Sequence, residues 1–141
     1  MMQRHLSPWR EMHWLRDADR RVEHAQLVVA APVALGAITM ALTVGMLLSR
    51  RVDITLLMTR WVPTFALSLL FLVINGVAAW CIGRRQAVGG YVAIGLFAYR
   101  IGFAMWYGHG LSVTVAYAVL GIWLVLRAAA PLGMRLPLRT P

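Results

Sequence analysis

Apolar residues along the chain fall into four blocks that are separated by short polar connections. Each block is about 20 residues long, which is the length of an α-helix that crosses a hydrocarbon core of about 30 Å. The pattern therefore predicts transmembrane helices at about residues 26–48, 61–83, 87–108 and 111–129. We expect an all-α protein in which residues 25–130 form one four-helix transmembrane bundle.

Residues 1–24, which precede the first block, have the pattern of an amphipathic helix. Ser7 and Pro8 resemble an N-cap followed by a proline at the first helical position, and the helix is expected to end near His24. Trp9 and the surrounding arginines are typical of a segment that lies along a membrane surface. We therefore predict a short interfacial helix on the cytoplasmic side.

Composition agrees with a membrane protein, because 60% of the 141 residues are hydrophobic and only 13% are charged. A soluble domain of this size could not bury that much apolar surface. The formal net charge is +9, and every basic residue is an arginine. These arginines flank the apolar blocks, so we expect them to meet anionic lipid headgroups, and we expect no nucleic-acid binding. Cys81 is the single cysteine, which excludes a disulfide within the chain.

The arginines are also distributed unevenly between the two predicted sides of the membrane. Ten lie in the N-terminal segment, the second connection and the tail, whereas three lie in the first connection, residues 50–60. The positive-inside rule then predicts that both termini are cytoplasmic. We expect an integral protein of a bacterial inner (plasma) membrane. Residues 131–141 include three prolines and are expected to form an irregular tail on the same side.

Arg100 is the main functional lead, because it lies inside the third apolar block. It precedes Gly108 by eight residues, so it is predicted to lie about 12 Å below the outer boundary of the membrane. A charge at this depth costs a few kcal/mol and usually faces a bundle interior or a water-filled cavity. None of the five carboxylates lies in a predicted span. The partner of Arg100 is therefore water, backbone carbonyls, a ligand anion, Asp53 from the first connection or another subunit, with snorkelling as the non-functional alternative.

Other helices offer polar side chains at a similar depth, and these are candidate pocket residues: Thr39, Thr43, Ser68, Thr114 and Tyr117. We expect them to line a pocket around Arg100 in the outer half of the bundle and to hold an anion or a polar headgroup. The alternative is that each hydroxyl donates to a carbonyl of its own helix. Asn75 lies deeper in the second span and is expected to bond across to a neighbouring helix, as a binding or packing residue.

Small residues four apart in the third span permit close helix contact. The pairs are Gly89 with Ala93 and Ala98 with Gly102, and either can serve within the bundle or between subunits.

Catalytic and metal-binding patterns are not evident. No carboxylate or histidine lies in a predicted span, so no set of nucleophile, base and acid can be assembled there. His24 and His109 lie on opposite sides of the predicted membrane, which argues against a haem held by two histidines. We expect no metal site and no evident cofactor, and an enzyme is not the favoured interpretation.

The segment Arg100–Tyr107, which reads RIGFAMWY, resembles the Arg-Ile/Val-…-Tyr segment in the third helix of the MAPEG family. Members of that family are small four-helix membrane proteins, many of them glutathione-dependent enzymes and usually trimers. The resemblance implies Arg100 and Tyr107 as site residues and glutathione as a cofactor. The family's second helix carries Arg-x-x-x-Asn-x-x-Glu, whereas Arg60–Leu67 of this chain has neither the Asn nor the Glu.

Three functions remain open from the sequence, and they follow in order of preference. The first is an accessory or assembly subunit of a larger membrane complex, with other membrane subunits or a second copy as the partner. The second is a membrane protein that binds a lipophile or an anion without catalysis. The third is a MAPEG-like, glutathione-dependent enzyme. The lack of carboxylates and histidines in the predicted spans disfavours a proton-coupled transporter, which usually needs such a relay.

Overall fold

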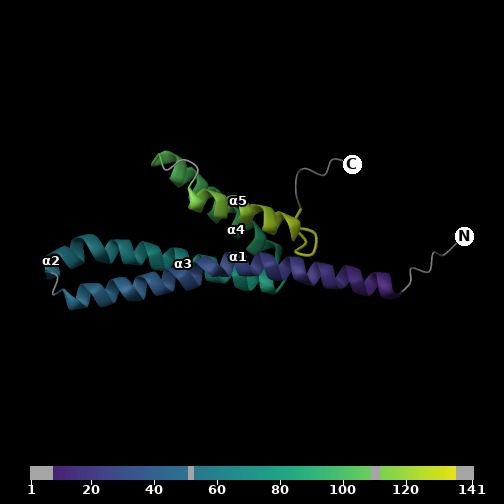
Figure 1. Cartoon of the computed structure of the whole chain (residues 1–141), viewed down its shortest axis with the longest axis horizontal. Coiled ribbons are helices and arrows are strands. Elements are labelled where there is room, and N and C mark those ends of the chain that lie inside the picture. The colour runs from purple at the N-terminus through teal and green to yellow at the C-terminus, as the bar shows by residue number, and fades with distance from the viewer. Residues whose placement is uncertain (1–7, 51–52, 109–111, 136–141) are drawn as a thin grey trace, which may run out of the picture.

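The computed structural model describes residues 8–50, 53–108 and 112–135, and all regular structure in them is helical (Figure 1). The elements are α1 (Pro8–Ser49), α2 (Ile54–Leu56), the π-helical turn η1 (Leu57–Trp61), α3 (Val62–Gly83), α4 (Ala87–Trp106) and α5 (Val113–Arg127). The side chain of Trp9, the predicted interface anchor, lies outside the described part.

Three stretches of helix are long and apolar enough to cross a membrane: Leu15–Ser49, Ile54–Gly83 and Ala87–Trp106. The protein is therefore all-α and has the helices of a membrane protein. The fourth predicted span corresponds to α5, which is apolar but has only 15 residues and a length of about 22 Å. A total of four spans stays a prediction.

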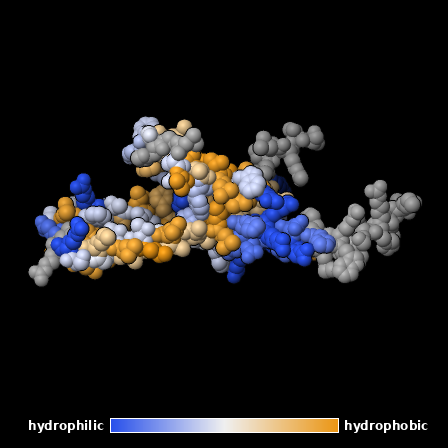
Figure 2. Space-filling view, in the orientation of Figure 1, coloured by the Kyte–Doolittle hydropathy of each residue, from blue (hydrophilic) through white to orange (hydrophobic). Residues whose placement is uncertain are grey.

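Helix α1 is one continuous helix of 42 residues, about 63 Å long. The expected division between a short helix ending near His24 and a separate span beginning near residue 26 is not present. The physical reason is local, because residues 20–31 contain neither glycine nor proline to end the helix. Figure 2 shows hydrophilic surface over the charged first part of α1 and apolar surface farther along it. An interfacial position for the first part stays a prediction.

The helices form two antiparallel pairs, which we call arms (Figure 1). The long arm consists of α1 packed on α3, and the short arm consists of α4 packed on α5. A tight turn at residues 84–86 joins the arms, and Arg85 adopts a positive φ of 56° in it. Contacts between α3 and α4 and between α1 and α5 hold the arms together at this end, and the arms diverge toward their other ends.

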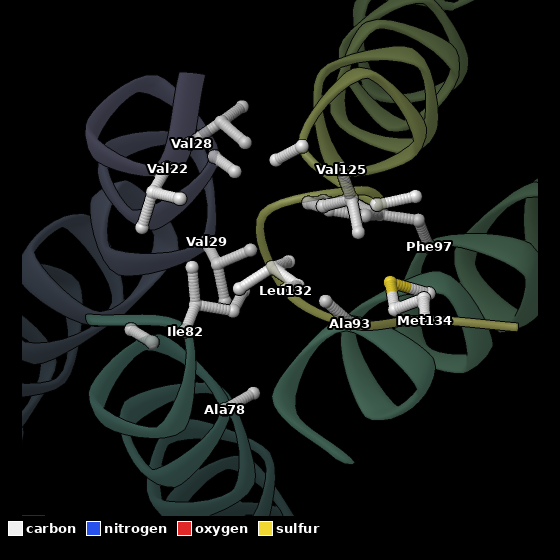
Figure 3. Close-up of a cluster of buried hydrophobic side chains, with 14 of the residues drawn as sticks. Val22, Val28, Val29, Ala78, Ile82, Ala93, Phe97, Val125, Leu132 and Met134 are labelled. Carbon is white, nitrogen blue, oxygen red and sulfur yellow. The ribbon is translucent and has the colours of Figure 1, made fainter. Parts of the chain in front are cut away.

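The buried core lies at the joined end (Figure 3). Small residues allow the backbones to approach there: a Cβ added to Gly89 would lie 2.7 Å from the Cβ of Cys81 and 2.8 Å from the carbonyl oxygen of Ala78. Ala93, one turn later, is fully buried. This pair of small residues therefore serves contact within the bundle, and Cys81 is a buried packing residue.

The segment that follows α5 folds back into the core. Leu132 and Met134 are buried, and Leu132 points toward Val29 and Ile82 in Figure 3. The hydroxyl of Tyr91 donates to the carbonyl oxygen of Arg135 at 3.0 Å and accepts from its backbone N–H at 2.8 Å. The first residues of the predicted irregular tail are thus part of the hydrophobic core.

Candidate functional site

Tyr117 of the short arm forms a hydrogen bond to α1 of the long arm. Proline has no backbone N–H, so Pro32 leaves the carbonyl of Val28 without its usual partner four residues along the helix. The hydroxyl of Tyr117 in α5 donates to that carbonyl oxygen. The Tyr117 ring also meets Phe97 edge-on, with ring centroids 6.1 Å apart. Tyr117 therefore supplies the Val28 carbonyl with a donor and links α5 to α1.

The long arm and Arg100 of α4 line an open cavity of about 410 Å³, which we call the interarm cleft. The hollow between the arms is visible in Figure 2. The polar lining residues are Thr39, Thr43, Thr64, Ser68 and Arg100. The other lining residues, mostly apolar or aromatic, are Pro32, Gly36, Met40, Trp61, Phe65, Phe71 and Leu72.

A second hollow lies on the α5 side of Arg100. Its volume is about 440 Å³, and its lining residues are Arg100, Phe103, Ala104, Ser112 and Thr114. Arg100 therefore lines both hollows.

Arg100 is half-buried and has no hydrogen-bond or ion-pair partner among the side chains and carbonyls that the structure describes. Asp53, which the sequence offered as one partner, is exposed at the start of α2, where its carboxylate accepts from the backbone N–H of Thr55 at 3.2 Å. The ion pair recorded for the described residues joins Arg85 to Asp19 and lies at the joined end of the arms. Because a guanidinium carries five N–H donors, Arg100 can bind an anion in the cleft.

The threonine hydroxyls of the cleft donate to carbonyls of their own helices. Thr39 donates to Leu35 at 2.8 Å, Thr43 donates to Thr39 at 2.8 Å, and Thr64 donates to Arg60 at 2.9 Å. This is the alternative that the sequence left open for these side chains. Each oxygen still has lone pairs that can accept from another group.

Ser68 differs from these threonines, because its hydroxyl makes no hydrogen bond within the part of the chain that the structure describes. It is half-buried and lies four residues after Thr64 on α3. Its O–H is therefore available to donate to a bound molecule. The same spacing of four is a sequence signal that could have added Thr64 to the predicted pocket residues, whereas nothing in the apolar pattern marked the aromatic residues of the cleft.

Asn75 does not line either hollow. Its side chain is 2% exposed, and its amide nitrogen donates to the carbonyl of Phe71 on the same helix at 2.7 Å. Within residues 8–50, 53–108 and 112–135 it makes no bond to a neighbouring helix, because a short amide reaches the carbonyl one turn earlier on its own helix. Of the predicted site residues, the structure thus brings four into one cavity: Arg100, Thr39, Thr43 and Ser68.

Tyr107, the second residue implied by the MAPEG resemblance, is exposed just after α4, where its ring lies 4.5 Å from that of Phe103. No protein-family model, no curated protein and no solved structure matches the chain. In the described part of the chain, no three His, Cys, Asp or Glu side chains are grouped so that they could hold a metal ion.

Proposed function

We propose that this chain is a small integral protein of a bacterial inner membrane that binds an anionic lipid in the interarm cleft. One observation carries the proposal: the half-buried guanidinium of Arg100 borders a cavity and lacks an acidic partner among the described residues. A guanidinium within a membrane is expensive unless water, a polar group or an anion meets it. Binding a lipid phosphate lowers that cost.

The apolar lining favours a lipid over a free anion. Met40 and Leu72 line the same cavity as Arg100, so an acyl chain and a charged headgroup can occupy it together. The helices of both arms expose large apolar side chains, which suits contact with the hydrocarbon of a bilayer. We therefore expect the ligand to enter sideways from the membrane.

In this proposal α1, α3, α4 and the shorter α5 all cross the membrane, and both termini are cytoplasmic. At the joined end Arg84 lies 4.3 Å from the ring centre of Trp80, and Arg127 lies 5.4 Å from that of Trp123. Tryptophan and arginine near helix ends are typical of a membrane interface, and the arginine excess favours the cytoplasmic one. The cleft then opens in the outer half, and the first part of α1 meets the inner surface.

The test is lipid analysis by mass spectrometry after purification in a mild detergent. The wild type and Arg50→Leu, which removes an exposed arginine outside the cleft, should retain an acidic phospholipid. Arg100→Leu should fold, because it removes the insertion cost, and should lose that lipid. Arg100→Lys should retain it partly, because lysine lacks the planar fork. Equal lipid profiles for the wild type and Arg100→Leu would overturn the proposal.

An accessory subunit of a larger membrane complex is the second candidate, although the sequence ranked it first. The observation that favours it lies on the outward side of α4, where a Cβ added to Gly95 or Gly102 meets nothing within 4 Å and Ala98 is exposed. Small residues let a partner helix approach closely. Gly102→Leu should then release co-purifying membrane subunits while leaving the bound lipid in place. Purification of the wild type without other membrane subunits would contradict the accessory-subunit function.

A further inference from the structure

The hydrogen-bonding capacity of the interarm cleft is divided between donors and acceptors. Arg100 can only donate. The threonines can only accept, since their protons already bond to the carbonyls of Leu35, Thr39 and Arg60. A ligand that satisfies the whole cleft therefore needs acceptors for Arg100 and donors for the threonine oxygens.

These groups lie at several levels along the helices that border the cleft. Thr39 and Thr43 are four residues apart on α1, and Thr64 and Ser68 are four residues apart on α3. Four residues correspond to about 6 Å along a helix, so α1 and α3, the two helices of the long arm, each carry two polar positions one turn apart. A headgroup that satisfies them must be longer than a single phosphate.

We propose, resting on the lipid-binding function above, that the ligand is an acidic phospholipid whose headgroup carries hydroxyl groups, namely a phosphoglycerol. Its phosphate accepts from Arg100 and Ser68, and its glycerol hydroxyls donate to the threonine oxygens. A bare phosphate monoester satisfies Arg100 but supplies few donors. Phosphocholine has no N–H or O–H group. Phosphoethanolamine has donors, but its ammonium group would lie in the same cavity as the guanidinium, where like charges repel.

The experiment measures lipid binding to the purified full chain by native mass spectrometry. The probes are phosphatidylglycerol, phosphatidic acid, phosphatidylethanolamine and phosphatidylcholine with identical acyl chains. Phosphatidylglycerol should bind more tightly than phosphatidic acid by roughly 2- to 12-fold for each hydrogen bond that its glycerol makes. Phosphatidylcholine and phosphatidylethanolamine should bind most weakly.

Threonine variants identify the acceptors. The double variant Thr39→Val with Thr43→Val keeps the side-chain shape and removes both oxygens, so it should lower phosphatidylglycerol affinity several-fold and leave phosphatidic acid affinity unchanged. Thr59→Val is the matched control, because the Thr59 hydroxyl also donates to a carbonyl four residues earlier, that of Thr55, at 2.8 Å, but Thr59 does not line the cleft. The double variant Thr39→Ser with Thr43→Ser keeps both hydroxyl oxygens that the valine variant lacks. It should therefore keep the preference for phosphatidylglycerol over phosphatidic acid.

The outcomes separate this inference from the proposed function. Equal binding of phosphatidylglycerol and phosphatidic acid, both lost in Arg100→Leu, would overturn the phosphoglycerol assignment and leave lipid binding intact. Preferred binding of phosphatidylethanolamine would overturn the assignment as well. Binding that is the same in the wild type and Arg100→Leu for every lipid would overturn the proposed function itself.

Discussion

Removing the hydroxyl of Tyr117 should destabilise the junction between the arms, and Pro32 determines by how much. Tyr117→Phe keeps the ring against Phe97 and deletes the group that donates to the carbonyl of Val28. That carbonyl has no helical donor, because residue 32 is a proline. The substitution therefore leaves a carbonyl without a partner in a residue that is only 8% exposed.

The magnitude follows from two contributions. A neutral hydrogen bond contributes about 0.5–1.5 kcal/mol, and a buried polar group left unpaired costs about 1–3 kcal/mol. Hydrogen bonds between membrane helices average about 0.6 kcal/mol and reach about 1.7 kcal/mol. The missing N–H of Pro32 puts this bond at the upper end, so we expect Tyr117→Phe to lower the free energy of unfolding by about 1–2 kcal/mol.

Pro32→Ala supplies an N–H that can donate to the same carbonyl. In that background Tyr117→Phe should cost less than about 0.5 kcal/mol, which gives a coupling of about 1 kcal/mol between the two positions. The four proteins are unfolded in mixed micelles with increasing SDS, and helix content is followed by circular dichroism. Tyr99→Phe is the control, because Tyr99 is exposed and its hydroxyl makes no hydrogen bond in the described part of the chain. An equal cost of Tyr117→Phe in both backgrounds would refute the reasoning.

Three further predictions concern the rest of the chain. Gly89→Ala should lower the unfolding free energy by about 1–3 kcal/mol, because the added methyl group would overlap α3. Gly102→Ala is the control and should be nearly neutral, and equal effects of the two variants in SDS unfolding would contradict this packing. Leu132→Ala should cost about 2–5 kcal/mol, since this side chain is 2% exposed, and a loss below 1 kcal/mol would argue against a buried position. A reporter fused after Pro141 should behave as cytoplasmic and one inserted at Asp53 as external; the reverse pattern would invert the proposed orientation.

The sequence alone determined the helical class and the approximate extent of most helices. In a membrane, each backbone polar group must be satisfied within its own segment, so helix lengths follow from local composition. The grouping of Arg100 with Thr39 and Ser68 also followed from the sequence, because antiparallel spans of known length set the depth of every residue. The continuity of α1 through His24 was missed, since a change from charged to apolar residues does not by itself end a helix.

Only the tertiary structure decided how these helices use their faces. Gly89 and Gly102 lie in similar sequence contexts, yet one is covered by α3 and the other is open. Tyr117 was predicted as a pocket residue, but its hydroxyl instead donates to the carbonyl of Val28. That carbonyl lacks a helical donor because residue 32, 85 positions before Tyr117, is a proline. Such pairings depend on which helices are neighbours and at what angle they separate. Local composition predicts neither the neighbours of a helix nor the angle between helices, because both depend on contacts between residues far apart in the chain.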